Sequence, residues 1–356
     1  MSLTERQIPS GAQLVRYLYA NAPPWARTLP QPGETLILHG DPGSGIDEAL
    51  AWIAEASYHA GPVVTLDPRL VGDYPSLVRE LVISIAANAF DEDLSARLAA
   101  ISESPNGPLP ELPAGRHDFL QVATKLVNPS NEYSPGALAE VLRYLPSGLL
   151  VVRDAHLLSG RWAREALWEL RGVVQDLQRH ALVLGSLTEA HRELVAPSAA
   201  FLGAGRVDPV GTDRGPNTWE RILDMHQIAV SREDLHFLLS RTHGLAVPTL
   251  SLLLDAEAIG ASAALAQHVQ RASEQIPVVL KMARIITRYG PSLLLRLARG
   301  LPPYARPSAT ARDTNRALRQ LAYHGLVARA GARAWRVADP FLSDALLSRP
   351  LPSQLT

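Results

Sequence analysis

The sequence GDPGSGID at residues 40–47 decides the fold. It follows an apolar run suited to a buried strand (35–39, TLILH) and precedes a segment with helical periodicity (46–60). A strand, a Gly-rich turn and a helix in this order are the setting of the pattern G-x-x-x-x-G-K-[ST], in which backbone N–H groups cradle phosphates. The stretch therefore predicts a phosphate-binding loop, although an ordinary Gly-Pro-Gly turn is the alternative for the loop taken alone.

Two positions of the loop depart from this pattern. Gly40, Gly43 and Gly45 keep the glycine frame, but Ile46 stands where the pattern has Lys, and Asp47 stands where it has Ser or Thr. In the pattern, the Lys contacts the β- and γ-phosphates and the hydroxyl is a ligand of Mg²⁺. The loop thus keeps the frame and lacks the side chains that carry the chemistry.

A second motif lies at residues 149–158, LLVVRDAHLL, where polar residues follow an apolar strand. It resembles the hhhhD[DE]AH motif of P-loop ATPases of the AAA+ and STAND type. Alignment on the AH pair puts Arg153 at the Walker B Asp and Asp154 at the next acidic position. A shifted alignment makes Asp154 the Walker B residue but leaves the AH pair unmatched, so we place it second.

Three positions that contact Mg²⁺ and the γ-phosphate in these motifs therefore differ from the motifs in this chain: Ile46, Asp47 and Arg153. An Arg in the site repels a metal cation, and an Asp in the loop repels phosphate. Because the fold implied by the resemblance places the two motifs side by side, we expect Asp47 and Arg153 to form a salt bridge where Mg²⁺ would lie. The alternative is that both side chains point to solvent. We expect no catalytic residues, no cofactor and no metal site.

Other segments extend the resemblance to about residues 33–348. A strand at 63–66 and the helix SLVRELVISIA resemble AAA+ ATPases of the origin-recognition and transposition-regulator type. The strand 181–185 ends in Ser186, which in this family would face the nucleotide as sensor 1. The stretch ELVAPSAAFLGAG (193–205), where such ATPases often have an arginine finger, contains no Arg. The segment THGLAVPTLSLLLD loosely resembles the STAND lid motif, and an ordinary helix start at its Pro is the alternative.

The C-terminal part is typical of a winged helix-turn-helix. Helical segments at 276–290, 291–300 and 311–327 precede a two-stranded wing, ARAGARAWRV, which turns at Gly331-Ala332. The wing followed by DPFL resembles the C-terminal domain of archaeal-type ATPases in the STAND group. The expected fold class is therefore α/β, with a P-loop NTPase-like parallel sheet, a helical lid and a C-terminal winged helix-turn-helix.

Positive charge is concentrated in this part of the chain. Residues 296–336 contain nine Arg and one acidic residue, Asp313, which gives +8, whereas the whole chain carries −1. Such a cluster indicates binding of duplex DNA. A solvated Arg-rich face that contacts a protein partner is the alternative. The candidate DNA-binding residues lie on the third helix, on the wing and just before the helix: Arg306, Arg312, Arg316, Arg319, Arg329, Arg333 and Arg336.

The expected domains are an N-terminal helix and linker (1–32), a degenerate P-loop NTPase-like domain (33–210), a helical lid (211–275) and a winged-helix domain (276–350). The absence of Cys excludes disulfides, thiolate metal sites and Cys nucleophiles. No stretch approaches the ~18 continuous apolar residues of a membrane helix, and the N-terminus lacks a signal-peptide pattern. These features indicate a cytoplasmic protein without membrane contacts.

These patterns together indicate a pseudo-ATPase: a DNA-binding or scaffold subunit of a bacterial multi-protein assembly, in defence, mobile elements or replication control. Lys125 and Lys281 are the only lysines, and this preference for Arg is typical of a GC-rich bacterial genome. It does not account for the missing loop Lys, because Ile does not replace a charge. The alternative function is a nucleotide-binding switch with unconventional site residues, such as Arg153 in place of the Lys.

Overall fold

Five short apolar segments form a parallel sheet in the order β2-β3-β4-β1-β5. The structure is a computed structural model that describes residues 12–19, 23–58, 61–90, 92–103, 117–128, 136–158, 161–203, 205–211, 215–304, 310–331 and 334–348. The three inner strands are almost wholly buried, as strands covered by helices on both faces must be. The strands are β1 (Thr35–Gly40), β2 (Val63–Leu66), β3 (Gly148–Val152), β4 (His180–Leu187) and β5 (Arg206–Pro209).

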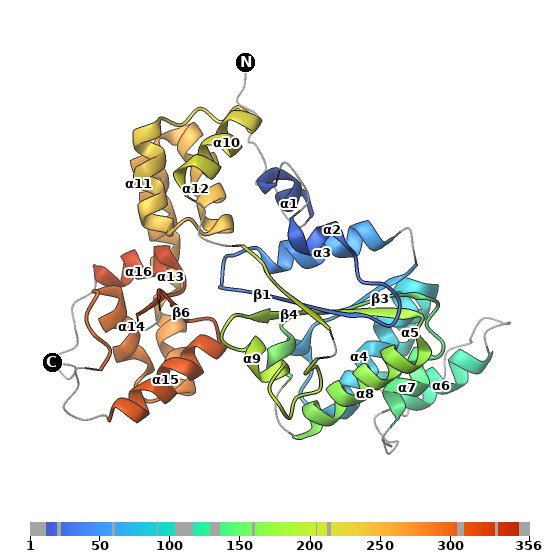
Figure 1. The fold of residues 1–356 in the computed structure, drawn as a ribbon. Helices are drawn as coiled ribbons and strands as arrows, with labels where there is room; N and C mark the ends of the chain where they lie inside the picture. The colour runs from blue at the N-terminus through green and yellow to red at the C-terminus, as the bar shows by residue number, and fades with distance from the viewer. Residues whose placement is uncertain are drawn as a thin grey trace.

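Helices cover both faces of this sheet (Figure 1). In β1, Leu36 and Leu38 face one core cluster, whereas Ile37 between them faces the other, because side chains alternate along a strand. The first face is covered by α1 (Ala12–Leu18), α2 (Pro24–Arg27) and α3 (Ile46–Ser57). The second is covered by α4 (Tyr74–Ile85), α5 (Glu92–Glu103), α6 (His117–Val127), α7 (Ala137–Leu142) and α8 (Arg161–Leu177). The short helix α9 (His191–Leu194) follows β4.

The remaining elements form a second, mostly helical body, whose core also includes Leu14 and Leu18 of α1. The elements after α12 follow the order that the sequence predicts: helices, then an antiparallel two-stranded sheet, then a closing helix. None of the described helices is long and apolar enough to span a membrane. The elements are α10 (Pro216–His226), α11 (Arg232–Thr242), α12 (Ala246–Ile259), α13 (Ala261–Ile286), α14 (Gly290–Ala298), α15 (Ala311–Tyr323), β6 (Val327–Arg329), β7 (Trp335–Val337) and α16 (Pro340–Leu347).

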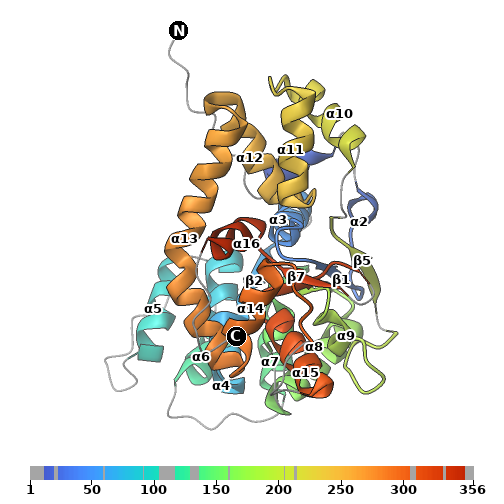
Figure 2. The ribbon, with the colours of Figure 1, turned by 90° about the vertical axis from the view of Figure 1, so that its left-hand side faces the viewer.

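Helix α13 crosses the boundary expected at residues 275 and 276 between lid and winged helix. Figure 2 shows it running along one side of the molecule, from the lid helices to α14. Pro277 would suit the start of a new helix, yet it lies inside α13. The helix continues because Ala272, Ile276 and Ala283 are buried in the core shared with α12 and α16, which offsets the backbone donor that Pro lacks. The lid and the C-terminal elements therefore share one core.

The turn between α15 and β6 packs against the edge of the sheet where β1 and β4 end. The Tyr323 hydroxyl donates a hydrogen bond to the His156 carbonyl oxygen, and the two rings meet edge to face with centroids 5.4 Å apart. A Cβ added at Gly325 would lie 3.4 Å from Leu187 and 3.5 Å from Pro42. Burial, and the neighbouring His324, lower the pKa of His156 to about 4. His156 is thus a neutral residue at the contact between the two bodies.

We expect acid to weaken the fold through His156. The unfolded residue titrates near pH 6.5, so its contribution to stability is full above that pH. Between pH 6.5 and about 4 the unfolded chain binds a proton that the folded chain does not, at a cost of about 1.4 kcal/mol per pH unit. His156→Gln, which cannot titrate, should flatten the fall in unfolding free energy measured by urea denaturation between pH 7.5 and 5. Exposed His236→Gln is the control, and equal slopes for wild type and His156→Gln would contradict the assignment.

Candidate functional site

The Gly-rich loop keeps the backbone form that its sequence predicts. Gly43 and Gly45 have φ angles of +81° and +97°, a region that side chains rarely adopt. The Ser44 N–H donates to the Asp41 carbonyl oxygen at 2.9 Å, which closes a turn. Gly45 is the N-cap of α3, and no side chain caps the helix there. The loop therefore still leads from β1 into the N-terminus of a helix.

The side chain at the position of the missing Lys packs into the protein. Ile46 is half-buried against the core cluster beneath α3. A Cβ added at Gly185 of β4 would lie 3.3 Å from Ile46 Cγ2. The aliphatic side chain is thus part of the packing between α3 and the sheet, and it brings no positive charge to the loop.

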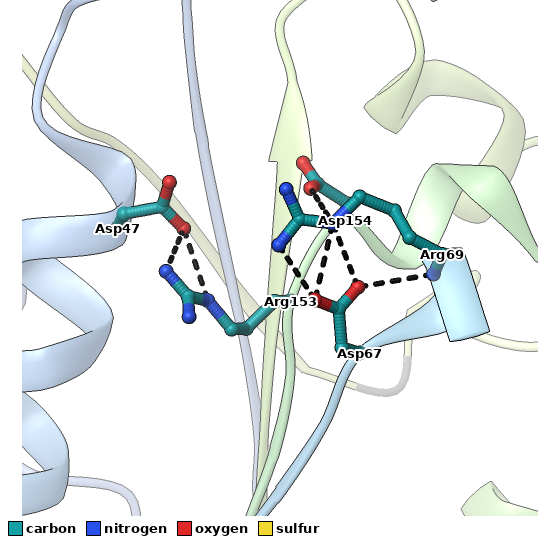
Figure 3. A network of polar contacts seen from close by, with 5 residues as sticks. All are labelled: Asp47, Asp67, Arg69, Arg153 and Asp154. Carbon is teal, nitrogen blue, oxygen red and sulfur yellow. Dashed lines mark hydrogen bonds and ion pairs between the residues drawn. The ribbon is translucent and has the colours of Figure 1, made fainter.

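Arg153 and Asp47 form the ion pair that the two altered motifs predict. The Arg153 N–H donates to the Leu66 carbonyl oxygen at 3.0 Å, which continues the ladder between β3 and β2. Its guanidinium extends to α3, where Nη2 and Nε lie 2.9 and 3.2 Å from Asp47 Oδ1 (Figure 3). The prediction of a salt bridge is confirmed. Arg153, not Asp154, is the residue that reaches the Ser/Thr position of the loop.

A second Arg–Asp group continues from this pair along the edge of the sheet (Figure 3). Arg69 Nη2 lies 2.6 Å from Asp67 Oδ2, and Arg69 Nε lies 3.9 Å from Asp154 Oδ2. Asp154 has a left-handed backbone with φ of 42°. The sequence analysis missed Asp67 and Arg69, although the position of Asp67, directly after the strand paired with β3, could have indicated them.

Four carboxylates line the loop cavity, which has a volume of about 250 Å³. Asp41, Asp47, Glu48 and Asp154 line it, and none of the described lining residues is Lys, Arg or His. Burial, followed by the neighbouring Asp47, raises the pKa of Asp154, and burial raises the pKa of Glu48. A nucleotide phosphate in this cavity would meet carboxylates without a lysine, so the described lining residues do not fit the phosphate groups of a nucleotide.

The lid covers the loop from the other body. The Val247 N–H donates to the Gly43 carbonyl oxygen at 3.0 Å. A Cβ added at Gly43 would lie 3.1 Å from Cδ of Pro248. Pro248, which belongs to the lid motif in the sequence, thus packs directly on the backbone of the loop.

The expected sensor residue is not exposed to the loop. Strand β4 extends to Leu187, and Ser186 is buried at 1% exposure, with its hydroxyl donating to the Leu187 carbonyl oxygen. The expectation that Ser186 faces the site was wrong, because the longer strand places it inside the fold. Thr188 instead lines a second cavity of about 450 Å³ beside the loop, together with His39 and Ser44.

The candidate DNA-binding residues fall into two groups. Arg312, Arg316 and Arg319 are exposed on α15, whose first turn is capped by Thr310. Arg329 and Arg336 on the wing strands instead have acidic partners in the α/β domain, Glu189 and Asp41. Arg306 and Arg333 lie outside the described residues.

Comparisons with known proteins place the fold. No protein-family model and no curated protein matches the chain. Among solved structures, the Walker-type ATPase PABY2304 of Pyrococcus abyssi is similar with a TM-score of 0.61 and 15% identity, over 88% of this chain and 91% of that chain. The Aeropyrum pernix Orc1 protein in complex with DNA matches with a TM-score of 0.44 and 14% identity, over 91% of this chain and 88% of that chain. Cdc6p from Pyrobaculum aerophilum matches with a TM-score of 0.41 and 15% identity, over 96% of this chain and 95% of that chain. The chain therefore has the fold of a P-loop NTPase.

Proposed function

We propose that this chain is a P-loop protein without ATPase activity that serves as a DNA-binding or scaffold subunit of a bacterial multi-protein assembly. The ion pair between Arg153 and Asp47 carries the first part of this proposal. Each residue replaces one that would contact Mg²⁺, and the two satisfy each other's charge. An assembly in defence, mobile elements or replication control would use the fold as a scaffold.

Phosphoryl transfer depends on positive charge at the transferred group, and this site does not supply it. In P-loop enzymes the Lys and the metal neutralise the developing charge on the phosphate oxygens. Here the equivalent positions hold an aliphatic side chain and an Arg bonded to Asp47. Two further arginines lie near the loop: Arg69 is paired with Asp67, and Arg336 is paired with Asp41. The alternative, a nucleotide switch that uses Arg153 as its cation, requires Arg153 to leave Asp47 when the nucleotide binds.

We expect the purified chain neither to hydrolyse ATP above background nor to bind it more tightly with Mg²⁺. Phosphate release and calorimetric titration with and without Mg²⁺ measure the two properties. Gly45→Glu is the control for contamination, because it places a carboxylate in the loop. Turnover in the wild type that Gly45→Glu abolishes would refute the proposal, and Mg²⁺-dependent binding that Arg153→Ala abolishes would favour the switch.

A double-mutant cycle tests whether the ion pair stabilises the site. Asp47 and Arg153 are 58% and 36% exposed, so the coupling energy should be modest, about 0.5 to 1 kcal/mol. Arg153→Ala should cost more than Asp47→Ala, because it leaves Asp47 beside the carboxylates of Glu48 and Asp154. Urea denaturation of the four proteins gives the values. Asp47→Ala combined with Arg143→Ala, which is exposed elsewhere, should be additive, and additivity for Asp47 and Arg153 as well would refute the coupling.

The exposed face of α15 supports the DNA-binding part of the proposal. Arg312, Arg316 and Arg319 are four and three residues apart, so they lie on one side of the helix, and the buried side is formed by residues such as Leu318 and Leu321. Asp313 on the same helix bonds to the cap Thr310, which holds its pKa low. Three guanidinium groups on a solvent-facing helix are suited to phosphate contacts and base readout.

Full-length protein should bind duplex DNA with an affinity that falls steeply with salt. Arg316→Ala combined with Arg319→Ala should weaken binding and reduce the slope of log K against log salt by about 0.9 for each lost phosphate contact. Fluorescence anisotropy at several salt concentrations measures both. Arg143→Ala combined with Arg221→Ala removes two exposed arginines elsewhere and should change little. Unaltered affinity in the α15 variant would indicate that this face contacts a protein partner.

A further inference from the structure

The wing arginines lie against the α/β domain, while those of α15 face solvent. Arg336 Nη2 on β7 lies 3.6 Å from Oδ2 of Asp41 in the Gly-rich loop, and the two side chains are only 14% and 28% exposed. Arg329 Nε on β6 lies 3.1 Å from Glu189 Oε1, just after β4, with exposures of 30% and 12%. Both described arginines of the wing thus bond to carboxylates in the other body.

Further contacts besides the two ion pairs fix the position of the same surface. The Arg329 guanidinium also stacks over the Trp335 ring, 4.0 Å from its centroid. Tyr323 bonds to the His156 carbonyl oxygen, and Gly325 lies against Leu187 and Pro42. The carboxylates of Asp41 and Glu189 therefore have a defined orientation relative to the wing.

We infer that these contacts form a latch, defined as the ion pairs Arg336–Asp41 and Arg329–Glu189, that keeps the wing from DNA. The inference rests on the proposed DNA-binding function and adds its regulation. A phosphate and a carboxylate require the same guanidinium donors, so DNA must displace Asp41 and Glu189 before the wing can bind it. Among the described candidate DNA-binding residues, the arginines of α15 are exposed, whereas Arg329 and Arg336 are paired. Because Asp41 belongs to the Gly-rich loop, the latch joins the wing directly to that loop.

Removing the carboxylates of the latch should strengthen DNA binding without changing any Arg. Asp41→Asn combined with Glu189→Gln should bind duplex DNA about three- to tenfold more tightly than wild type. The slope of log K against log salt concentration should be steeper for this variant by about 0.9 for each phosphate contact that the wing gains. Glu103→Gln combined with Asp176→Asn removes the same charge from exposed sites elsewhere, so it controls for long-range repulsion. Equal affinity and slope in the latch variant and this control would overturn the latch.

A crosslink tests the competition directly, because the chain has no Cys of its own. Glu189→Cys combined with Arg329→Cys should react rapidly with a short bis-maleimide, and the crosslinked protein should bind DNA more weakly than the same variant before reaction. Saturating DNA should slow the crosslinking. A rate unaffected by bound DNA would overturn the latch while leaving DNA binding intact. Absence of DNA binding in every variant, the latch variant included, would instead refute the proposed function, and the latch with it.

Discussion

The burial of β1 on both faces is the constraint on which the rest of the structure depends. Strand β1 leaves the sheet through a tight turn, and the close packing at that turn demands glycine. A Cβ at Gly40 would lie 2.6 Å from the Val210 carbonyl oxygen, and one at Gly43 would press on Pro248. The glycine frame therefore has a reason to persist that is independent of phosphate. The pattern is lost at the start of α3, where Ile46 packs toward the sheet and Asp47 pairs with Arg153.

Charge at the carboxyl edge of the sheet has been rearranged into Arg–Asp pairs. A P-loop enzyme combines a Lys, a hydroxyl and a carboxylate around an external cation and an external anion. Here Arg153 and Asp47 lie 2.9 Å apart at the corresponding positions, so each side chain neutralises the charge of the other. Arg69 with Asp67 repeats the arrangement one strand further out. The exposure of these pairs makes each a weak source of stability, and their main effect is to limit the repulsion among the carboxylates of the edge.

The sequence predicted the parts of the fold that depend on local pattern. Strand β2 begins and ends at the predicted residues 63 and 66, and the salt bridge followed from aligning two motifs. The predictions from the sequence were wrong where contacts between distant parts of the chain determine the structure. The helix expected to begin at residue 276 is part of the longer α13, because packing against α12 and α16 extends the helix past Pro277. The partners of Arg329 and Arg336 could not be predicted either, because the sequence of a basic wing is the same whether the wing contacts DNA or acidic residues of its own chain.

The Gly-rich loop connects three parts of the molecule. The lid donates a hydrogen bond to the Gly43 carbonyl oxygen of the loop. The wing forms an ion pair with the Asp41 carboxylate, and Arg153 of the second motif forms one with Asp47. Direct contacts join these parts, and each contact uses a different residue of the loop. The backbone of residues 40–47 therefore links the positions of the lid, the wing and the strand that carries the second motif.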